Sequence, residues 1–283
     1  MLLNLIVRGP HLEIYYCRIL FILGLSLFQS MTSANEEPIE FTFAYDVQEG
    51  FPSFMGNGQS IPEKRPGTYI EILQLVEQKV PIKLKLVRLP WARCKAALKA
   101  NLVDGINSSF SNAREEIGIF PYKKDGSVDT NRKITSSIYR LYTKGDSPIQ
   151  YDPVSGLILN TGKGILAPLG YSIVDDFKKR GILIEQPPTG VKGIMQMLAL
   201  GRASGVIAHE NQATHVLKSN SKLYSGIRPL DPPIKEKNYY ILISKDFYQR
   251  NPAISEQIWN VIGELRKSRF PDILNSYLSN HRN

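Results

Sequence analysis

The sequence is short of cysteine, with two in 283 residues. Cys17 lies in an N-terminal segment that has the pattern of a leader, so Cys94 is the single thiol of the remaining chain. A single thiol cannot form an intramolecular disulfide. Cys94 shares helical spacing with Trp91 and Leu98, and no histidine lies near it in sequence. We therefore expect a buried structural thiol rather than a nucleophile.

Histidine is also sparse, with four residues in the chain. His11 lies in the N-terminal segment and His281 lies close to the C-terminus. His209 and His215 are six residues apart, which does not match the i,i+4 spacing of two ligands on one helix face. We therefore expect no metal site, and no pattern in the sequence indicates a cofactor.

Long apolar runs are absent after residue 34, so we expect no further membrane span, which would need about 20 apolar residues. Before that point, Ile19–Phe28 is an apolar run of ten that follows Arg8 and Arg18, and small residues end the segment at Ala34. This pattern is typical of a secretory signal peptide. We expect residues 1–34 to be cleaved and the mature chain to be periplasmic. An uncleaved anchor is the alternative.

Blocks of basic residues are absent too, although the formal net charge is +9. Removal of residues 1–34 lowers Lys+Arg from 35 to 33 and Asp+Glu from 26 to 25, which leaves +8. Because the Lys and Arg residues are dispersed and the leader exports the chain, we do not expect a nucleic-acid partner. A positive surface suits an anionic small-molecule ligand equally well.

The clearest functional pattern lies in residues 86–122. An apolar strand ends at Pro90, Trp91 begins an amphipathic helix, and a second strand leads into a hydroxyl-rich segment. That segment contains Ser108, Ser109 and Ser111. Asn112 is expected to cap a helix that carries Arg114. Hydroxyl groups at a strand end, followed by an arginine near a helix start, are suited to binding a small anion.

Strand-like and helix-like patterns alternate through the rest of the chain. The expected strands are Ile39–Tyr45, Ile82–Val87, Ile134–Thr143, Gly164–Ala167, Ile182–Glu185, Gly205–Ala208 and Tyr239–Ile243. The expected helices include Gly67–Val80, Ile173–Arg180, Val191–Ala199, one that starts at Pro252, and Phe270–Leu278. The order predicts two βαβαβ units, each with a parallel sheet and with ligand at the carboxyl ends of its strands.

The order of these parts resembles the type 2 periplasmic solute-binding proteins, the family-3 group that mostly serves ABC importers of polar amino acids. The matching parts are Pro90-Trp91, Asp104-Gly105, Ser108–Ser111, Arg114 and Pro121-Tyr122. The resemblance covers roughly Ile39–Leu278. It implies an α/β, two-lobed periplasmic binding protein-like II fold, in which each lobe is a mostly parallel sheet with flanking helices and two hinge strands join the lobes. The implied boundaries are 35–133 plus 245–283 for lobe 1 and 134–244 for lobe 2.

The resemblance also implies ligand-binding residues. Arg114 matches the arginine that takes the ligand's carboxylate, and an ion pair with Glu115 or Glu116 is the alternative for it. The other matches are Ser108, Ser109 and Ser111 as donors beside the arginine, Trp91 as an aromatic wall, and Tyr171 and Ser172 as second-lobe contacts. Phe51 and Phe54 match the aromatic position of the first loop loosely.

His209 marks a departure from the family pattern. Amino-acid binders keep an acidic residue at this strand tip for the ligand's α-ammonium, so either the adjacent Glu210 binds the ammonium or the ligand has none. Adjacent strand residues point to opposite faces, which directs Glu210 away. A protonated His209 would favour an additional acid group. Affinity is then expected to rise as pH falls from about 7.5 to about 5.5, through the ordinary imidazole pKa of about 6.5.

The sequence therefore predicts a monomeric, exported protein that captures a small polar anionic solute, an amino acid or organic acid, by hinge closure. The expected partner is an ABC permease, with membrane contact only through export or permease docking. We expect no enzymatic activity. One alternative is an enzyme on the same fold that resembles cyclohexadienyl dehydratases, with Glu210 or His209 as general acid. The other is an exported sensor or binding module without a transporter.

Overall fold

A computed structural model describes residues 37–279, so the predicted signal peptide and its cleavage site lie outside the described residues. Every element described here lies within Pro38–Asn283. Its strands are β1 (Ile39–Asp46), β2 (Ile82–Leu89), β3 (Gly105–Ser109), β4 (Thr135–Lys144), β5 (Gln150–Asp152), β6 (Leu157–Leu159), β7 (Ile165–Leu166), β8 (Gly205–His209), β9 (Ile227–Pro229) and β10 (Lys235–Ile243). Its helices are α2 (Thr68–Glu77), α3 (Trp91–Lys99), α4 (Asn112–Glu115), α5 (Ser172–Lys178), α6 (Val191–Ala199), α7 (Glu210–Ser219), α8 (Lys245–Arg250), α9 (Pro252–Ser268) and α10 (Phe270–Ser279), with a short 3₁₀ turn at Thr130–Arg132.

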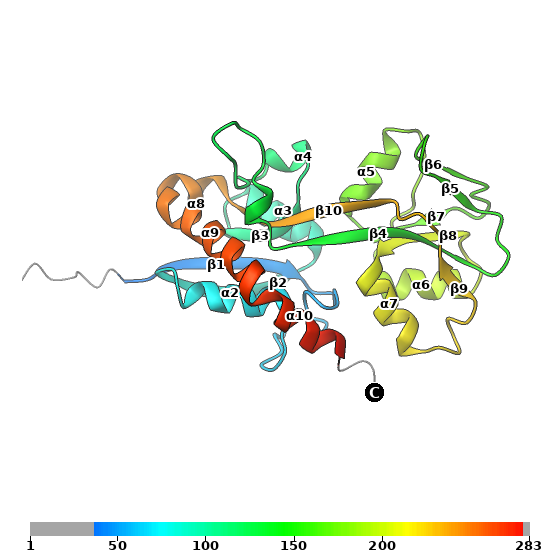
Figure 1. Ribbon diagram of the computed structural model, residues 1–283, viewed down its shortest axis with the longest axis horizontal. Helices are drawn as coiled ribbons and strands as arrows, with labels where there is room; N and C mark the ends of the chain where they lie inside the picture. Colours follow the sequence, from blue (N-terminus) through cyan, green and yellow to red (C-terminus); the bar gives the residue numbers. More distant parts are fainter. Residues whose placement is uncertain (1–36, 280–283) are drawn as a thin grey trace, which may run out of the picture. The chain divides into compact units, whose positions relative to one another are not determined.

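One curled sheet runs through this unit in the order β2-β1-β3-β10-β4-β8-β7, and β9 pairs with β4. β1 is parallel to β2 and β3, and β7 is parallel to β8. β10 pairs antiparallel with β4 through residues 235–239 and then with β3 through residues 239–243. Figure 1 shows β4 and β10 crossing side by side between two groups of elements. The predicted α/β fold with two joining strands is confirmed.

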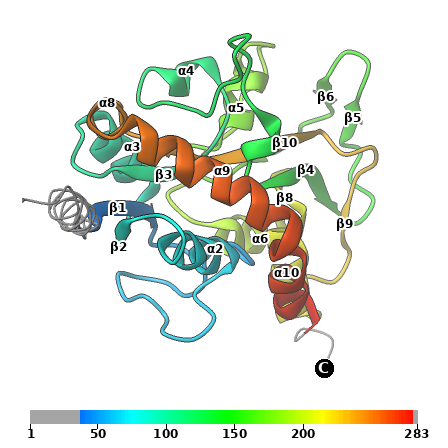
Figure 2. The ribbon, with the colours of Figure 1, turned by 60° about the vertical axis from the view of Figure 1, so that its left-hand side comes forward.

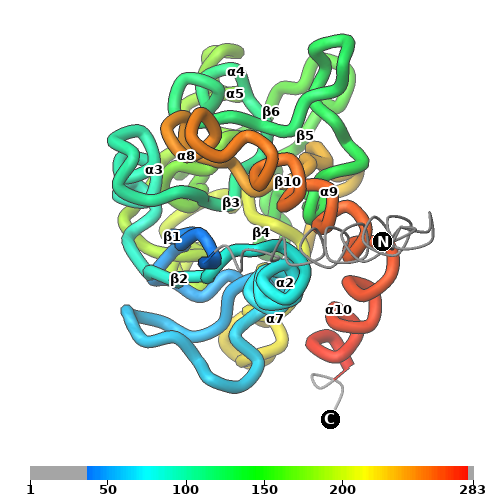
Figure 3. The backbone as a smooth tube through the Cα atoms, turned by 90° about the vertical axis from the view of Figure 1, so that its left-hand side faces the viewer, coloured from blue at the N-terminus to red at the C-terminus, as the bar shows by residue number. Residues whose placement is uncertain are grey.

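Alternation along β1 explains how the first group of elements packs. Phe41, Phe43 and Tyr45 face a core that includes α2 and α9, whereas Ala44 faces a second core that includes Cys94 of α3. Successive strand residues point to opposite faces of the sheet, so β1 carries a helix layer on each side. Figure 3 shows α3 and α2 on opposite sides of β1, and Figure 2 shows α9 and α10 following each other beside α2.

The hydrophobic clusters fall into two groups. Two clusters come from residues 41–134 and 239–270, and the other two come from residues 139–224. We call the elements around the first two the first half (β1–β3, α2–α4, α8–α10) and those around the others the second half (β5–β9, α5–α7). β10 contributes buried residues to the first group and β4 to the second, and the two strands pair with each other.

Cys94 is fully buried, as predicted for a structural thiol. Its Sγ lies 3.3 Å from the carbonyl oxygen of Leu89. Burial raises the pKa of this thiol to about 12, and a thiol that stays protonated at neutral pH is a poor nucleophile. Within residues 37–279, no helix is long and apolar enough to cross a membrane.

Several local predictions are wrong. The expected strand Ile182–Glu185 is reduced to a single bridge between Glu185 and Leu166. The segment is apolar because Ile184 packs in the core of the second half, although it has no partner strand. The β5–β6 hairpin, residues 150–159, is not among the expected strands. Asn112 is the first residue of α4 rather than its cap, a position that Ser111 holds through its backbone.

Two helices have no counterpart among the predicted elements. α7 buries only Ala213 and Val216, and α8 buries only Phe247. Amphipathic prediction needs an apolar stripe on one face, and one or two buried residues make too weak a stripe. Both helices are held by tertiary contacts, α7 against α6 and α8 against α9.

Candidate functional site: the cleft between the halves

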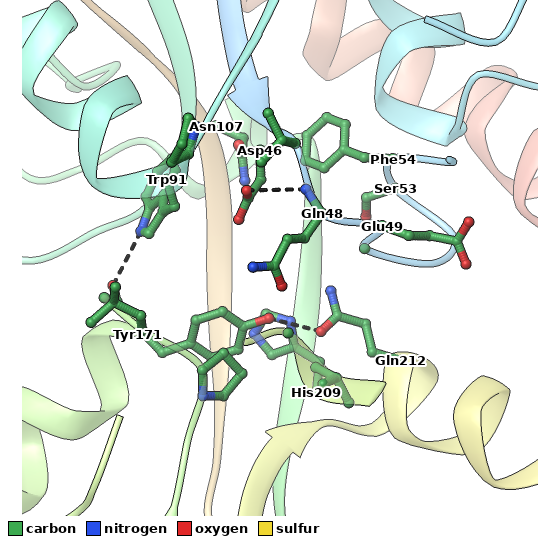
Figure 4. Close-up of a pocket in the computed structure, with 18 of the residues that line it drawn as sticks. Asp46, Gln48, Glu49, Ser53, Phe54, Trp91, Asn107, Tyr171, His209 and Gln212 are labelled. Carbon is green, nitrogen blue, oxygen red and sulfur yellow. Dashed lines mark hydrogen bonds between the residues drawn. The ribbon is translucent and has the colours of Figure 1, made fainter. Parts of the chain in front are cut away.

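A cavity of about 350 Å³ lies between the two halves. The first half lines it with the end of β1, the loop that follows, the start of α3, and Arg114. The second half lines it with segments 168–172 and 188–191, His209 and Gln212, and the crossing strands add Ser137, Tyr139 and Tyr239. Figure 4 shows Asp46, Gln48 and Trp91 on one side and Tyr171, His209 and Gln212 on the other. The cavity lies at the carboxyl ends of β1 and β8, the edge where α/β folds bind ligands.

Arg114 lines this cavity and is only 9% exposed. Its Nη1 donates to Ser108 Oγ (3.1 Å), Ser109 Oγ (2.8 Å) and the Ser109 carbonyl (3.1 Å). Its Nη2 donates to the Gly170 carbonyl of the second half at 3.3 Å. All of these acceptors are neutral, and no described carboxylate pairs with Arg114. The predicted alternative, an ion pair with an adjacent glutamate, does not form, because Glu115 accepts a hydrogen bond from Tyr122.

The three predicted serines are separated by the structure. Ser108 and Ser109 are buried behind the Arg114 guanidinium, which they hold, and neither lines the cavity. Ser111 lies beyond the end of β3 and lines a second cavity on the other side of Arg114 and Ser172. The structure thus places Ser111 outside the cleft, because the chain turns into α4 after β3 ends.

Trp91, Tyr171 and Ser172, for which the resemblance implies ligand contacts, all line the cavity. The indole Nε1 of Trp91 donates to the Gly170 carbonyl at 3.2 Å, and the Arg114 guanidinium lies 5.7 Å from the indole ring. Tyr171 Oη donates to Gln212 Oε1 at 2.8 Å. Ser172 begins α5, and its Oγ contacts Ser109 Oγ at 2.9 Å and Lys237 Nζ at 3.0 Å.

His209 ends β8 and faces the cavity within a cluster of tyrosines. Its Nε2 lies 2.8 Å from Tyr239 Oη, which lies 2.7 Å from Tyr139 Oη, and its ring stacks on Tyr171 at 4.9 Å. Burial, together with the charge of Lys237, lowers the pKa of His209 to about 3. The predicted gain of affinity requires protonation of His209, and the burial of this imidazole disfavours its protonation at mildly acidic pH.

Glu210 does not line the cavity. It begins α7, and its carboxylate pairs with Arg140 Nε at 2.5 Å, while Arg140 Nη1 pairs with Asp231 at 2.6 Å. The predicted outward orientation agrees with this pair. Within residues 37–279, no three His, Cys, Asp or Glu side chains are grouped to hold a metal ion.

Asp46 is a cavity residue that sequence reasoning missed. It ends β1, and its carboxylate accepts the backbone N–H of Gln48 at 3.2 Å. Burial raises its pKa, against the lowering effect of backbone N–H donors and of the charge of Arg88. Among the described residues, no basic side chain forms an ion pair with it. Its place directly after a strand of the parallel unit was the available sequence signal.

The other missed acid, Glu49, has partners. Its carboxylate lies 3.4 Å from His215 Nε2 and accepts the Gly56 N–H at 2.9 Å. The hydrogen bond from His215 lowers the pKa of Glu49. Phe51 stacks on the same imidazole, with ring centroids 4.2 Å apart, whereas Phe54 lines the cavity. Of the two aromatic residues proposed for the first loop, the structure therefore brings only Phe54 to the cleft.

Arg88 of β2 holds the loop that carries these residues. It is 3% exposed, and it donates to the carbonyls of Asp46 (3.1 Å from both Nε and Nη2), Met55 (3.1 Å), Ser60 (3.1 Å) and Gly56 (2.7 Å). A guanidinium has five N–H donors in a fixed plane, which suits several carbonyls converging on one point. The sequence pattern of β2 gave no sign of this arrangement.

Comparison with solved structures shows the same fold. A histidine kinase sensor domain with similarity to periplasmic binding proteins matches with a TM-score of 0.65 and 15% identity, over 86% of this chain and 97% of that one. An L-arginine-bound amino acid ABC transporter substrate-binding protein from Streptococcus pneumoniae matches with 0.64 and 16% identity, over 89% and 100%. A ligand-binding core from Nostoc punctiforme in complex with L-glutamate matches with 0.61 and 13% identity, over 85% and 99%. No family profile and no curated protein sequence matches the chain. The chain therefore has the fold of the type 2 periplasmic solute-binding proteins.

Proposed function

We propose that this protein is an exported, periplasmic solute-binding protein that captures a small polar solute in the cleft. In this proposal the lobes are residues 35–133 plus 245–283 and residues 134–244, and they close by rotation about β4 and β10. An ABC importer receives the solute, and the protein acts as a monomer without a cofactor.

The observation that carries the proposal is the buried guanidinium of Arg114, which lines the cleft without an ion-pair partner among the described residues. A buried charge without a counter-charge is costly. A solute carboxylate would supply the missing counter-charge. The Nε–H of Arg114 forms no hydrogen bond with the described residues, and a guanidinium can bind two oxygens of one acid group at once.

Asp46 extends the proposal to a second charged group on the solute. It is the other charged residue of the cavity without an ion-pair partner among the described residues, whereas Glu49 contacts His215. A solute that carries both a carboxylate and a protonated nitrogen would pair with Arg114 and Asp46 together. The structural neighbours bound to L-arginine and L-glutamate support the amino acid over the organic acid as the class of solute.

A thermal-shift screen of the chain from Asn35 onward tests this proposal. The screen pairs each amino acid with the corresponding acid that lacks the amino group. A solute at about 100 times its Kd is expected to add about 2.7 kcal/mol to the unfolding free energy. Stabilisation by amino acids alone supports both charged contacts, and stabilisation by both members of each pair supports Arg114 alone. No stabilisation by any amino acid, organic acid or sugar acid contradicts the proposed function.

The sensor alternative is supported by the similarity to a histidine kinase sensor domain. Both functions require the same cleft, so binding alone does not separate them. The two functions are separated by measuring uptake of the identified solute in cells with and without the gene. Loss of uptake in the deletion strain supports an importer, whereas unchanged uptake with a changed transcriptional response to the solute supports a sensor.

A further inference from the structure

A chain of hydrogen bonds connects Arg114 to the middle of a crossing strand. Arg114 Nη1 donates to Ser109 Oγ (2.8 Å), Ser109 Oγ lies 2.9 Å from Ser172 Oγ, and Ser172 Oγ accepts from Lys237 Nζ at 3.0 Å. Ser109 belongs to the first half and Ser172 to the second, so the bond between the two serines joins the halves. The two serines in the middle are buried, with exposures of 0% for Ser109 and 3% for Ser172, and Lys237 at the end is 8% exposed.

Lys237 lies where a rotation of the halves would be centred. It pairs with Ser137 in the middle of the five-residue ladder between β10 and β4, the part of the sheet that joins the two halves (Figure 1). Its ammonium also pairs with Asp176 Oδ2 of α5 at 2.9 Å. Both partners of this ammonium therefore belong to α5, although its backbone belongs to the crossing strand.

The two cations at the ends of the chain, Arg114 and Lys237, determine which hydrogen-bonding sites of each serine are occupied. Lysine and arginine side chains only donate hydrogen bonds, whereas a hydroxyl has one donor and two acceptor sites. Each serine therefore accepts from one cation, and one of the two hydroxyl protons bridges the two oxygens. A hydroxyl that accepts a charge-assisted bond is a stronger donor, so Lys237 strengthens the bond when Ser172 donates it and Arg114 strengthens it when Ser109 donates it.

We propose that Lys237 is a positioning residue for closure of the cleft. It holds Ser172 in the orientation that bonds Ser109, and so stabilises the state in which the halves are joined around Arg114. This inference rests on the proposed closure of two lobes, but its test needs no solute. Without Lys237, Ser172 lacks its charged donor, and the bond between the halves competes with other orientations of the hydroxyl.

The simpler explanation is that Lys237 only neutralises Asp176 and contributes to folding. A test must therefore measure the joined state itself, and must show that Lys237 acts through Ser172. Single-molecule FRET between dyes at Lys83→Cys in the first half and Lys222→Cys in the second reports the ratio of closed to open molecules. Both positions are exposed, and the buried thiol of Cys94, with its pKa of about 12, does not compete for the dyes.

The experiment is a double-mutant cycle in the solute-free protein. The closed-to-open ratio is measured for the dye-labelled parent, Lys237→Met, Ser109→Ala and the double variant, and the cycle is repeated with Ser172→Ala. We expect each single variant to lower the ratio, with a coupling of about threefold or more between them, as for members of one hydrogen-bond network. The coupling is expected to disappear with Ser172→Ala. Independent effects of the two variants, or a coupling that persists without Ser172, would overturn the proposal.

Two further variants address loss of folding and simple loss of charge. Lys235→Met removes the neighbouring lysine, whose Nζ lies 3.5 Å from Asp176 but which does not contact Ser172, and it is expected to leave the ratio unchanged. Lys237→Met with Asp176→Asn removes both charges of the pair, so no buried carboxylate is left without its partner. This pair is expected to fold and still to show the lowered closed fraction. A ratio restored to that of the parent would mean that Lys237 only neutralises Asp176, and would overturn the proposal.

Discussion

The two walls of the cleft differ in how they carry charge. The first half lines it with Asp46, Glu49 and Arg114. The second half lines it with Tyr171, His209, Gln212 and backbone segments that contain no acidic or basic side chain. Tyr139 and Tyr239 of the crossing strands extend this neutral wall.

Tyrosine is uncharged at neutral pH, and burial keeps His209 uncharged too, because it lowers the pKa of this imidazole to about 3. Tyr239 contacts Tyr139 and His209, and the Tyr171 hydroxyl donates to Gln212, so these groups have neutral hydrogen-bond partners. We infer that the first half recognises the charges of a solute and that the second half recognises its shape. The open protein is then expected to bind solute on the first half before the second closes over it.

The largest effect is expected from Arg88→Ala, which removes the support of the charged wall. Five hydrogen bonds to four loop carbonyls are lost, and buried carbonyls without donors are destabilising. We expect the unfolding free energy to fall by about 3 kcal/mol or more, measured by urea denaturation. Arg140→Ala, whose partners Glu210 and Asp231 are more exposed, is the matched control and should lose about 1 kcal/mol or less. Equal losses of unfolding free energy in the two variants would contradict the expectation that Arg88 stabilises the protein more than the exposed ion pairs of Arg140 do.

Arg114→Ala should weaken solute binding by about 1.5–3 kcal/mol, the range for hydrogen bonds to a charged group. Calorimetric titration with the solute from the screen measures this effect. Arg93→Ala is the control, because Arg93 is an exposed cation of the adjacent helix α3 and does not line the cavity. An affinity that is unchanged in Arg114→Ala would remove this arginine from the binding site.

Asp46→Asn is expected to weaken the binding of an amino acid and to increase the stability of the protein at pH 7. It keeps the acceptor for the Gln48 N–H and removes the charge, so binding of an amino acid should weaken by about 1–2 kcal/mol while binding of its deaminated counterpart does not. Because burial raises the pKa of Asp46 in the folded state, its contribution to stability is present below the unfolded pKa and is lost as pH rises through the folded one. At pH 7 the asparagine variant should therefore unfold at higher urea concentration than the parent. Weaker binding of both solutes alike would argue against an ammonium at Asp46.

The smallest effect concerns pH and the neutral wall. Since the pKa of His209 is lowered to about 3, solute affinity should not change through this residue between about pH 7.5 and pH 5.5. Stability should change, because the unfolded chain gains a proton at this histidine near pH 6.5 and the folded chain does not. The unfolding free energy is thus expected to fall as pH drops below about 6.5, and His209→Gln should reduce that slope. A slope that is identical in parent and variant would show that His209 is accessible to protons in the folded state.

Much of the first half could be predicted from sequence because its signals are local. The β1–α2–β2–α3–β3 order follows from apolar alternation, helical spacing and the breaker Pro90, and each predicted element of this unit is present. The second half was predicted less well. Its β5–β6 hairpin and α7 bury few side chains each, so their hydrophobic patterns are weak. The apolar residues of Ile182–Glu185 pack in the core, and the segment forms only a single bridge to Leu166.

By itself, the sequence determined the fold class, the buried thiol of Cys94 and the nearness of Arg114 to Ser108 and Ser109, because these depend on residues close together in the chain. Only the tertiary structure decided the charge of the site. Whether His209 is protonated depends on the tyrosines and Lys237 packed around it, and Glu210 leaves the cleft because Arg140 pairs with it. Asp46 stands without a counter-charge because Arg88 bonds its backbone carbonyl and not its carboxylate. A charge is set by the solvent and partners that surround it, and those come from distant parts of the chain.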